Sequence, residues 1–155
     1  MPTRRAAGLM ALSVLYACAP AAPNGVDPDR LDAAVGQAIG DPASCLLIAE
    51  APSGRVVYRY NTHTACARAL PACDAPGTRT LDGLLEATAR DGQPRALSCS
   101  TTADASRGVG WASGAIAAKS GGKRLVYAAM MEGDRALPGR MMSERLATAF
   151  RRAGL

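Results

Sequence analysis

Three segments of the chain repeat apolar residues with the spacing of an α-helix. Residues 27–40, DPDRLDAAVGQAIG, place an apolar residue every three or four positions and end at a glycine. An aspartate, either Asp27 or Asp29, is available to cap the start of this segment. Residues 80–92, TLDGLLEATARDG, and residues 138–154, PGRMMSERLATAFRRAG, have the same pattern and also end at glycine. The sequence therefore predicts three amphipathic helices.

The segments between these helices have the composition of β-strands. Residues 45–61, CLLIAEAPSGRVVYRYN, predict a hairpin whose turn is Pro52-Ser53-Gly54. Further strands are predicted at 95–101, 109–118 and 124–131, with a turn, KSGGK, at 119–123. Residues 62–79 are predicted to form a loop. This order of elements favours a single α+β domain over residues 29–155, with one antiparallel sheet of about five strands packed against the N- and C-terminal helices.

The first residues of the chain have the pattern of an export signal. Two arginines precede an apolar run over residues 6–17, which is too short to span a bilayer. The run ends in Leu15-Tyr16-Ala17-Cys18, which resembles a lipobox, although tyrosine is atypical at its second position. We expect a signal peptide over 1–17, a diacylated Cys18 that anchors the protein to the membrane, and a tether over 18–28. The alternative is ordinary signal cleavage near residues 19–22.

Export to the periplasm changes the interpretation of the cysteines, because disulfides form in oxidising compartments. With Cys18 set aside, an even number of cysteines is left, namely Cys45, Cys66, Cys73 and Cys99. Four cysteines allow three pairings. The short loop between Cys66 and Cys73 makes that pair the most natural one, leaving Cys45 and Cys99 to bond to each other or stay free.

Composition argues against several classes of site. The chain has no C-x-x-C motif, and its single histidine, His63, has no partner at ligand spacing, so neither a metal nor another cofactor is expected. The formal charge is +5, but Arg4 and Arg5 belong to the predicted signal peptide, and the other basic residues are scattered. Aromatic residues make up only 4% of the chain. We therefore expect no nucleic-acid partner.

Several short patterns together resemble one enzyme superfamily. They are the opening hairpin, the segment PACDAPGTRTL at 71–81, the strand GVGWASG at 108–114 and its partner RLVYAAMMEG at 124–133. These patterns and the element order are similar to the α/β half of the penicillin-recognising serine hydrolases, which include penicillin-binding transpeptidases and class D β-lactamases. The resemblance implies a shortened member of that superfamily without its helical subdomain.

The catalytic motifs of that superfamily are missing at the corresponding positions. The family uses Ser-x-x-Lys, in which the lysine amine lies one helical turn from the serine hydroxyl and accepts its proton. Here the four positions run from Asp74 to Gly77. The family's Lys-Thr/Ser-Gly strand corresponds to Ser100, Thr101 and Thr102, which supply no cation. The resemblance therefore predicts a degenerate site, in which neither Asp74 nor Ser100 acts as a nucleophile.

Three functions are compatible with these patterns. The first is a non-catalytic exported lipoprotein that acts as a binding or structural module of the cell envelope, with an unknown protein or cell-wall ligand. The second is a serine hydrolase that uses an unrecognised nucleophile, with Ser98, His63 and Asp104 among the available groups. The third is a small periplasmic inhibitor or interaction protein, for which an exposed sheet edge would be the expected binding surface.

Overall fold

The computed structural model describes residues 22–23, 25–117 and 122–155. The predicted signal peptide, Cys18 and most of the 119–123 turn lie outside these residues. The described residues form, in chain order, α1 Pro28–Ile39, β1 Ser44–Glu50, β2 Arg55–Tyr60, α2 His63–Cys66, β3 Leu70–Pro71, β4 Thr78–Arg79, α3 Leu81–Asp91, β5 Arg95–Ser100, β6 Gly108–Ile116, β7 Leu125–Gly133 and α4 Gly139–Ala153.

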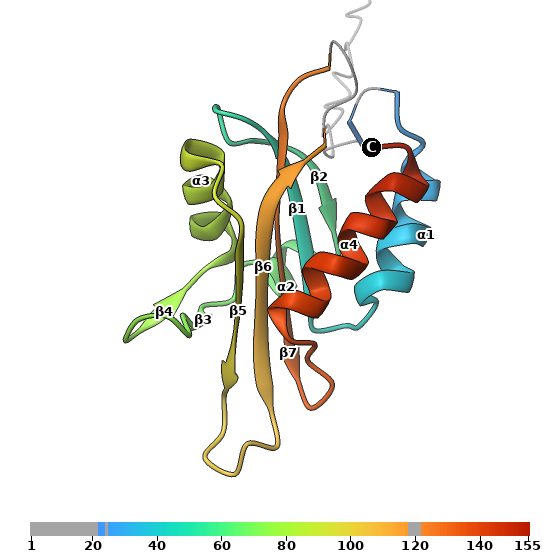
Figure 1. Cartoon of the computed structure of the whole chain (residues 1–155). Coiled ribbons are helices and arrows are strands. Elements are labelled where there is room, and N and C mark those ends of the chain that lie inside the picture. Colours follow the sequence, from blue (N-terminus) through green and yellow to red (C-terminus); the bar gives the residue numbers. More distant parts are fainter. Residues whose placement is uncertain (1–21, 24, 118–121) are drawn as a thin grey trace, which may run out of the picture.

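Five strands form one antiparallel sheet in the spatial order β2-β1-β7-β6-β5 (Figure 1). This confirms the predicted α+β fold and its five-stranded antiparallel sheet. The central strands β1 and β7 are buried along almost their whole length, and β2 and β5 form the two edges. The predicted loop over 62–79 is more ordered than expected, because it contains the single helical turn α2 and the small β3–β4 sheet.

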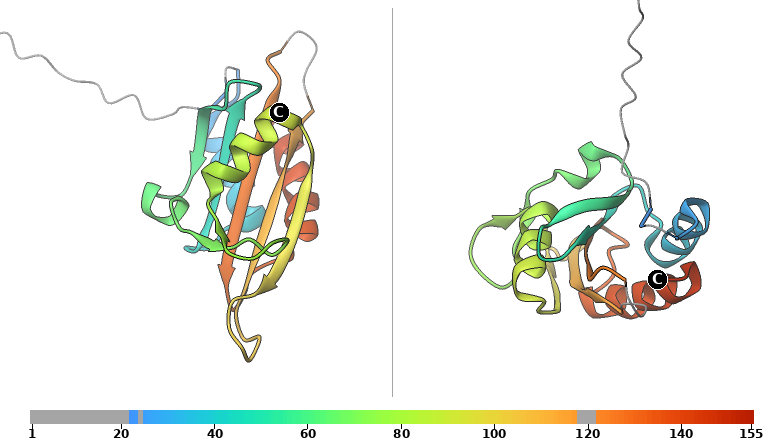
Figure 2. Two further views of the ribbon diagram at one scale, coloured as in Figure 1. Left: turned by 90° about the vertical axis from the view of Figure 1, so that its left-hand side faces the viewer. Right: turned by 90° about the horizontal axis from the view of Figure 1, so that it is seen from above.

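Helices cover both faces of the sheet, as the view from above shows (Figure 2). Successive residues of a strand point to opposite faces. Leu46 and Ile48 of β1 accordingly pack in the core with α1 and α4, while Leu47 and Ala49 pack in the core with α3. The terminal helices therefore share one face, as predicted, and α3 and Leu70 of the β3–β4 hairpin cover the other.

The helix termini follow the predicted capping pattern. Asp27 rather than Asp29 is the N-cap of α1, and its carboxylate accepts hydrogen bonds from the main-chain N–H groups of Asp29 and Arg30. Thr80 caps α3 in the same way. Gly92 and Gly154 end α3 and α4 in the left-handed conformation, with φ of 68° and 93°, which glycine adopts without steric cost.

The predicted Cys66–Cys73 disulfide is wrong. The structure pairs Cys45 with Cys66 and Cys73 with Cys99, with Cα–Cα separations of 5.3 and 5.4 Å. Spacing along the chain favoured the short loop, but tertiary packing decides which side chains meet. Helix α2 packs against β1, which brings Cys66 to Cys45, whereas the tip of the β3–β4 hairpin lies against β5 and its Cys99.

Two glycines bring the start of α4 into direct contact with the sheet. A Cβ atom at Gly139 would collide with the main chain of β5 and β6, and one at Gly110 would collide with the main chain just before α4. Pro138, the N-cap of α4, has no side-chain oxygen to accept a hydrogen bond. The N–H of Gly139 instead donates to the Ser98 Oγ of β5 at 3.0 Å. The edge strand therefore caps the helix that crosses it.

Candidate functional site

The residues that correspond to the superfamily's nucleophile motif lie in the loop between β3 and β4. Asp74 forms an ion pair with Arg79 across the tip of this hairpin. Gly77 has a φ of 95°, a left-handed conformation, just before β4 begins. Asp74 therefore stabilises a hairpin, and none of residues 74–77 has a side-chain hydroxyl.

The residues that correspond to the second motif lie where β5 ends and turns toward β6. The Thr101 N–H donates to the Arg107 carbonyl at 2.9 Å, which extends the β5–β6 pairing by one residue pair. Thr102 Oγ1 accepts a hydrogen bond from the Arg107 N–H, and Ser106 Oγ donates to Asp104. These hydroxyl and carboxylate groups stabilise the turn. The hydrogen bonds within the turn hold the pKa of Asp104 at about 2, so it is ionised at neutral pH.

The structure brings these two motif segments close together. The Cys73–Cys99 disulfide joins the residue before Asp74 to the residue before Ser100.

The groups proposed for an unrecognised serine hydrolase lie on separate parts of the fold. His63 opens α2, which packs against β1, and Ser98 lies on β5, with β7 and β6 between these two strands.

The open edge of β5 is the surface that the sequence did not locate. In an antiparallel pair, every second residue of a strand forms main-chain hydrogen bonds with its neighbour. The main-chain hydrogen bond from Thr101 to Arg107 shows which residues of β5 do so. The main-chain groups that point toward β6 are those of Arg95, Leu97 and Cys99. The main-chain N–H and C=O groups of the intervening residues, Ala96, Ser98 and Ser100, therefore point away from the sheet. All three of these residues are exposed and have small side chains.

The opposite edge strand, β2, is protected in ways that β5 is not. Arg55 and Arg59 place charges at both ends of β2, and a register shift at Ile48/Ala49 distorts its pairing with β1. Charges and bulges on an edge strand discourage pairing with another chain. Strand β5 has a regular register along its whole length and no charge between Arg95 and its last residue. Of the two edges, β5 is thus the more suited to accept another strand.

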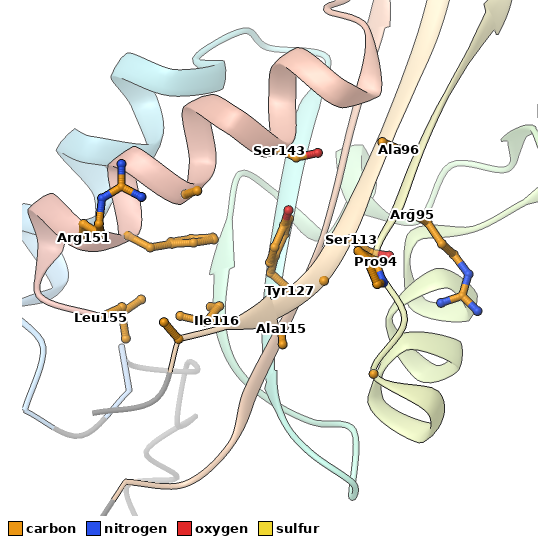
Figure 3. Close-up of a pocket in the computed structure, with 15 residues that line it drawn as sticks. Pro94, Arg95, Ala96, Ser113, Ala115, Ile116, Tyr127, Ser143, Arg151 and Leu155 are labelled. Atoms are coloured by element: carbon orange, nitrogen blue, oxygen red, sulfur yellow. The ribbon is translucent and has the colours of Figure 1, made fainter. Parts of the chain in front are cut away.

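An open groove adjoins this edge between α4 and the ends of β5 and β6 (Figure 3). It has a volume of about 680 Å³ and is lined largely by apolar side chains, including Ala96, Ile116 and Phe150. Figure 3 shows Tyr127 in the middle of the groove, with Arg151 and Leu155 at one end and Pro94 at the other. The groove can therefore accommodate an apolar side chain that projects from a strand added to β5.

Tyr127 supplies the polar group at the centre of the groove. Its ring packs edge-on against Phe150, with 5.1 Å between the ring centroids. Burial raises the pKa of the Tyr127 hydroxyl, and the nearby Ser143 partly offsets this effect. The phenol is therefore neutral at physiological pH and can donate a hydrogen bond. Its sequence context, an apolar strand, gave no indication of this role.

A second polar cluster holds the opposite end of the sheet together. Glu132, only 7% exposed, accepts hydrogen bonds from Arg68 at 2.9 Å and from Arg107 at 3.0 Å. Burial raises the pKa of Glu132, but hydrogen bonds from the two guanidinium groups lower it more, so it lies below its usual range. The cluster joins the end of β7 to the segments that precede β3 and β6.

Other features bear on cofactors and location. Over residues 22–23, 25–117 and 122–155, no group of three His, Cys, Asp or Glu side chains has the arrangement needed to hold a metal ion. None of the helices in the same ranges is long and apolar enough to cross a membrane. The two disulfides are typical of proteins that fold in an oxidising compartment.

Comparisons with known proteins identify no relative. No family model, no curated protein and no solved structure matches this chain. The resemblance to the penicillin-recognising serine hydrolases therefore remains a prediction from short sequence patterns.

Proposed function

We propose that this protein is an exported, non-catalytic binding module of the cell envelope, which binds an extended segment of a partner protein along β5. The open edge of β5 is the observation that carries the proposal. Ala96, Ser98 and Ser100 present main-chain donors and acceptors spaced for an added strand. Their small side chains leave space for larger side chains on the incoming strand.

The groove suggests the chemistry of that partner segment. Alternate side chains of a strand added to β5 would lie on the same face as α4, where Ala96 lines the groove. An apolar side chain at this position would be buried against Ile116 and Phe150. At one end of the groove lies Arg151, an exposed cation, which favours an acidic residue further along the partner segment.

The proposal includes the predicted location of the protein. Its sequence predicts a signal peptide and lipidation of Cys18, which would place the binding module at the periplasmic face of a membrane. The two disulfides support an oxidising compartment. In this proposal the protein is a shortened member of the penicillin-recognising superfamily that has lost its nucleophile. Asp74 forms an ion pair with Arg79, and Thr101 and Thr102 form hydrogen bonds with Arg107. These interactions stabilise turns, which supports the view that the positions have no catalytic role.

The test uses random peptides displayed on phage as the probe. Selected peptides are synthesised, and their Kd values are measured by calorimetry with the wild type, Ala96→Pro and the control Ala96→Ser. Proline removes the outward N–H of residue 96, whereas serine keeps it. We expect Ala96→Pro to weaken binding about tenfold, the equivalent of one good net hydrogen bond, and Ala96→Ser, which keeps the N–H, to weaken binding much less.

A second edge variant, Ser100→Pro, makes the same test at the other end of β5, and circular dichroism confirms that each variant is folded. Peptides that bind equally well to both proline variants would contradict the proposed surface. A library that yields no binding peptide would contradict peptide recognition altogether.

Catalysis is tested separately with a fluorescent penicillin, followed by denaturing electrophoresis and intact-mass measurement. We expect no covalent adduct on the folded protein. An adduct would show that one of its serines is an activated nucleophile, and the protein would then be an acyl-transfer enzyme rather than a binding module.

A further inference from the structure

The two disulfides lie in very different surroundings. Cys45 and Cys66 are 0% and 4% exposed, in the core where α2 packs against β1. Cys73 and Cys99 are both partly exposed, one at the tip of the β3–β4 hairpin and the other on the edge strand β5. Thiol–disulfide exchange requires a thiolate to reach a sulfur atom, so access alone favours reaction at Cys73–Cys99.

Regular strand pairing contributes little to holding the hairpin that carries Cys73. Strands β3 and β4 pair over only two residues each. Cys73 has a φ of 68°, a left-handed conformation that costs a residue with a Cβ atom about 1 kcal/mol or more. Once the disulfide opens, the hairpin tip can relax this conformation, which favours separation of the hairpin from the sheet.

The hairpin covers the only tryptophan in the chain. Trp111 is 0% exposed, and its Nε1–H donates to the carbonyl of Pro71 in β3 at 2.8 Å. Leu70 and Ala72, on either side of Pro71, are also buried. Movement of the hairpin would therefore break this hydrogen bond and expose the indole ring together with the apolar face of β6.

We propose that Cys73–Cys99 is a thiol-exchange site at which a dithiol reductant releases the β3–β4 hairpin and uncovers Trp111. A thiolate of the reductant attacks one sulfur, the Cys73–Cys99 bond breaks, and the other cysteine leaves as a thiolate that takes up a proton. The second thiol of the reductant then attacks the mixed disulfide, which releases the second cysteine and oxidises the reductant to its own disulfide. Two electrons pass to the protein. This proposal does not depend on peptide binding at β5.

The test is a titration of the purified, oxidised protein with dithiothreitol, sampled over time. Free thiols are trapped with N-ethylmaleimide and located by mass spectrometry of peptides, while tryptophan emission and far-ultraviolet circular dichroism are recorded in parallel. We expect Cys73 and Cys99 to be labelled about tenfold faster than Cys45 and Cys66 or more, because a buried disulfide reacts only after local opening. Trp111 emission should shift to longer wavelength while the circular dichroism spectrum is retained.

Each other result would overturn a defined part of the proposal. Equal labelling of the two pairs, or faster labelling of Cys45 and Cys66, would exclude a selective exchange site. Selective labelling with unchanged emission would show that the hairpin stays closed, and loss of the circular dichroism signal would show global unfolding. The double variant Cys73→Ser/Cys99→Ser, without reductant, should have the shifted emission of the opened form. If that variant does not fold, the wild-type titration still decides.

Discussion

At the residue scale, the absence of a Cβ atom at Gly139 allows α4 to approach the sheet closely. Gly139 lies directly on the main chain of β5 and β6, and its N–H donates to Ser98. The position requires glycine for space rather than for an unusual backbone angle. The pattern of apolar residues in 138–154 predicted the helix, but it carries no information about this contact.

Gly139→Ala should therefore destabilise the protein by about 2–4 kcal/mol, because the helix must shift away from β5 and β6. The free energy of unfolding in urea measures this effect. Gly114→Ala is the matched control, since a Cβ atom at Gly114 would have only ordinary van der Waals contacts, and a change within about 0.5 kcal/mol is expected. Equal effects of the two substitutions would contradict the close approach of α4.

At the scale of elements, long-range polar contacts join segments that the sequence pattern treats separately. Glu132 at the end of β7 binds Arg68, which follows α2, and Arg107, which precedes β6. The two arginines are 39% and 46% exposed, whereas the carboxylate they share is almost completely buried. Removal of the carboxylate charge would leave two guanidinium groups side by side with no anion between them.

We expect Glu132→Gln to lower the free energy of unfolding at pH 7 by about 1–3 kcal/mol, the usual loss for hydrogen bonds to charged groups. The pKa of Glu132 in the folded protein lies below the ordinary value of 4.5. Its stabilising effect should therefore be complete above pH 4.5 and be lost as the pH falls through the lowered pKa. Urea unfolding of both proteins at neutral and acidic pH measures this difference.

Glu50→Gln is the control for this prediction, because Glu50 also bridges two cations, Arg55 and Lys123. Those cations are 61% and 66% exposed, so solvent screens them more strongly, and the change should be smaller. A difference between wild type and Glu132→Gln that stays constant as the pH falls would contradict the proposed role of the Glu132 charge.

At the scale of the whole molecule, the predicted lipid anchor would determine where the protein acts. The described domain carries two disulfides and an open sheet edge, and a Pro- and Ala-rich segment of sequence separates it from Cys18. A diacylated Cys18 would confine the β5 edge to partners near the membrane surface, which raises their effective concentration.

If Cys18 is the lipid anchor, Cys18→Ser should move the protein from the membrane fraction into the soluble fraction. Fractionation of expressing bacteria, with immunoblotting, follows the protein, and intact mass detects the acyl chains on the wild type. Wild-type protein that is soluble and begins after Cys18 would show ordinary signal cleavage instead, and the lipidation prediction would be wrong.

Local patterns in the sequence determined most of the fold. Helical periodicity, capping residues and terminal glycines predicted α1, α3 and α4, and alternating or continuous apolar runs predicted the five main strands. These signals act over a few residues, so they can be detected without knowledge of the rest of the chain. The short turns within the β1–β2 and β6–β7 hairpins also predicted antiparallel pairing of those strands.

Only the tertiary structure decided which distant residues meet. It paired Cys45 with Cys66 and Cys73 with Cys99, where spacing along the chain had favoured Cys66 with Cys73. It also made β5 an edge, formed the groove beside Tyr127 and gathered two arginines around Glu132. These features depend on the order of strands in the sheet and on how helices cross it. Both depend on how side chains from distant segments pack together throughout the core. The pattern within any one segment of the sequence does not specify that packing.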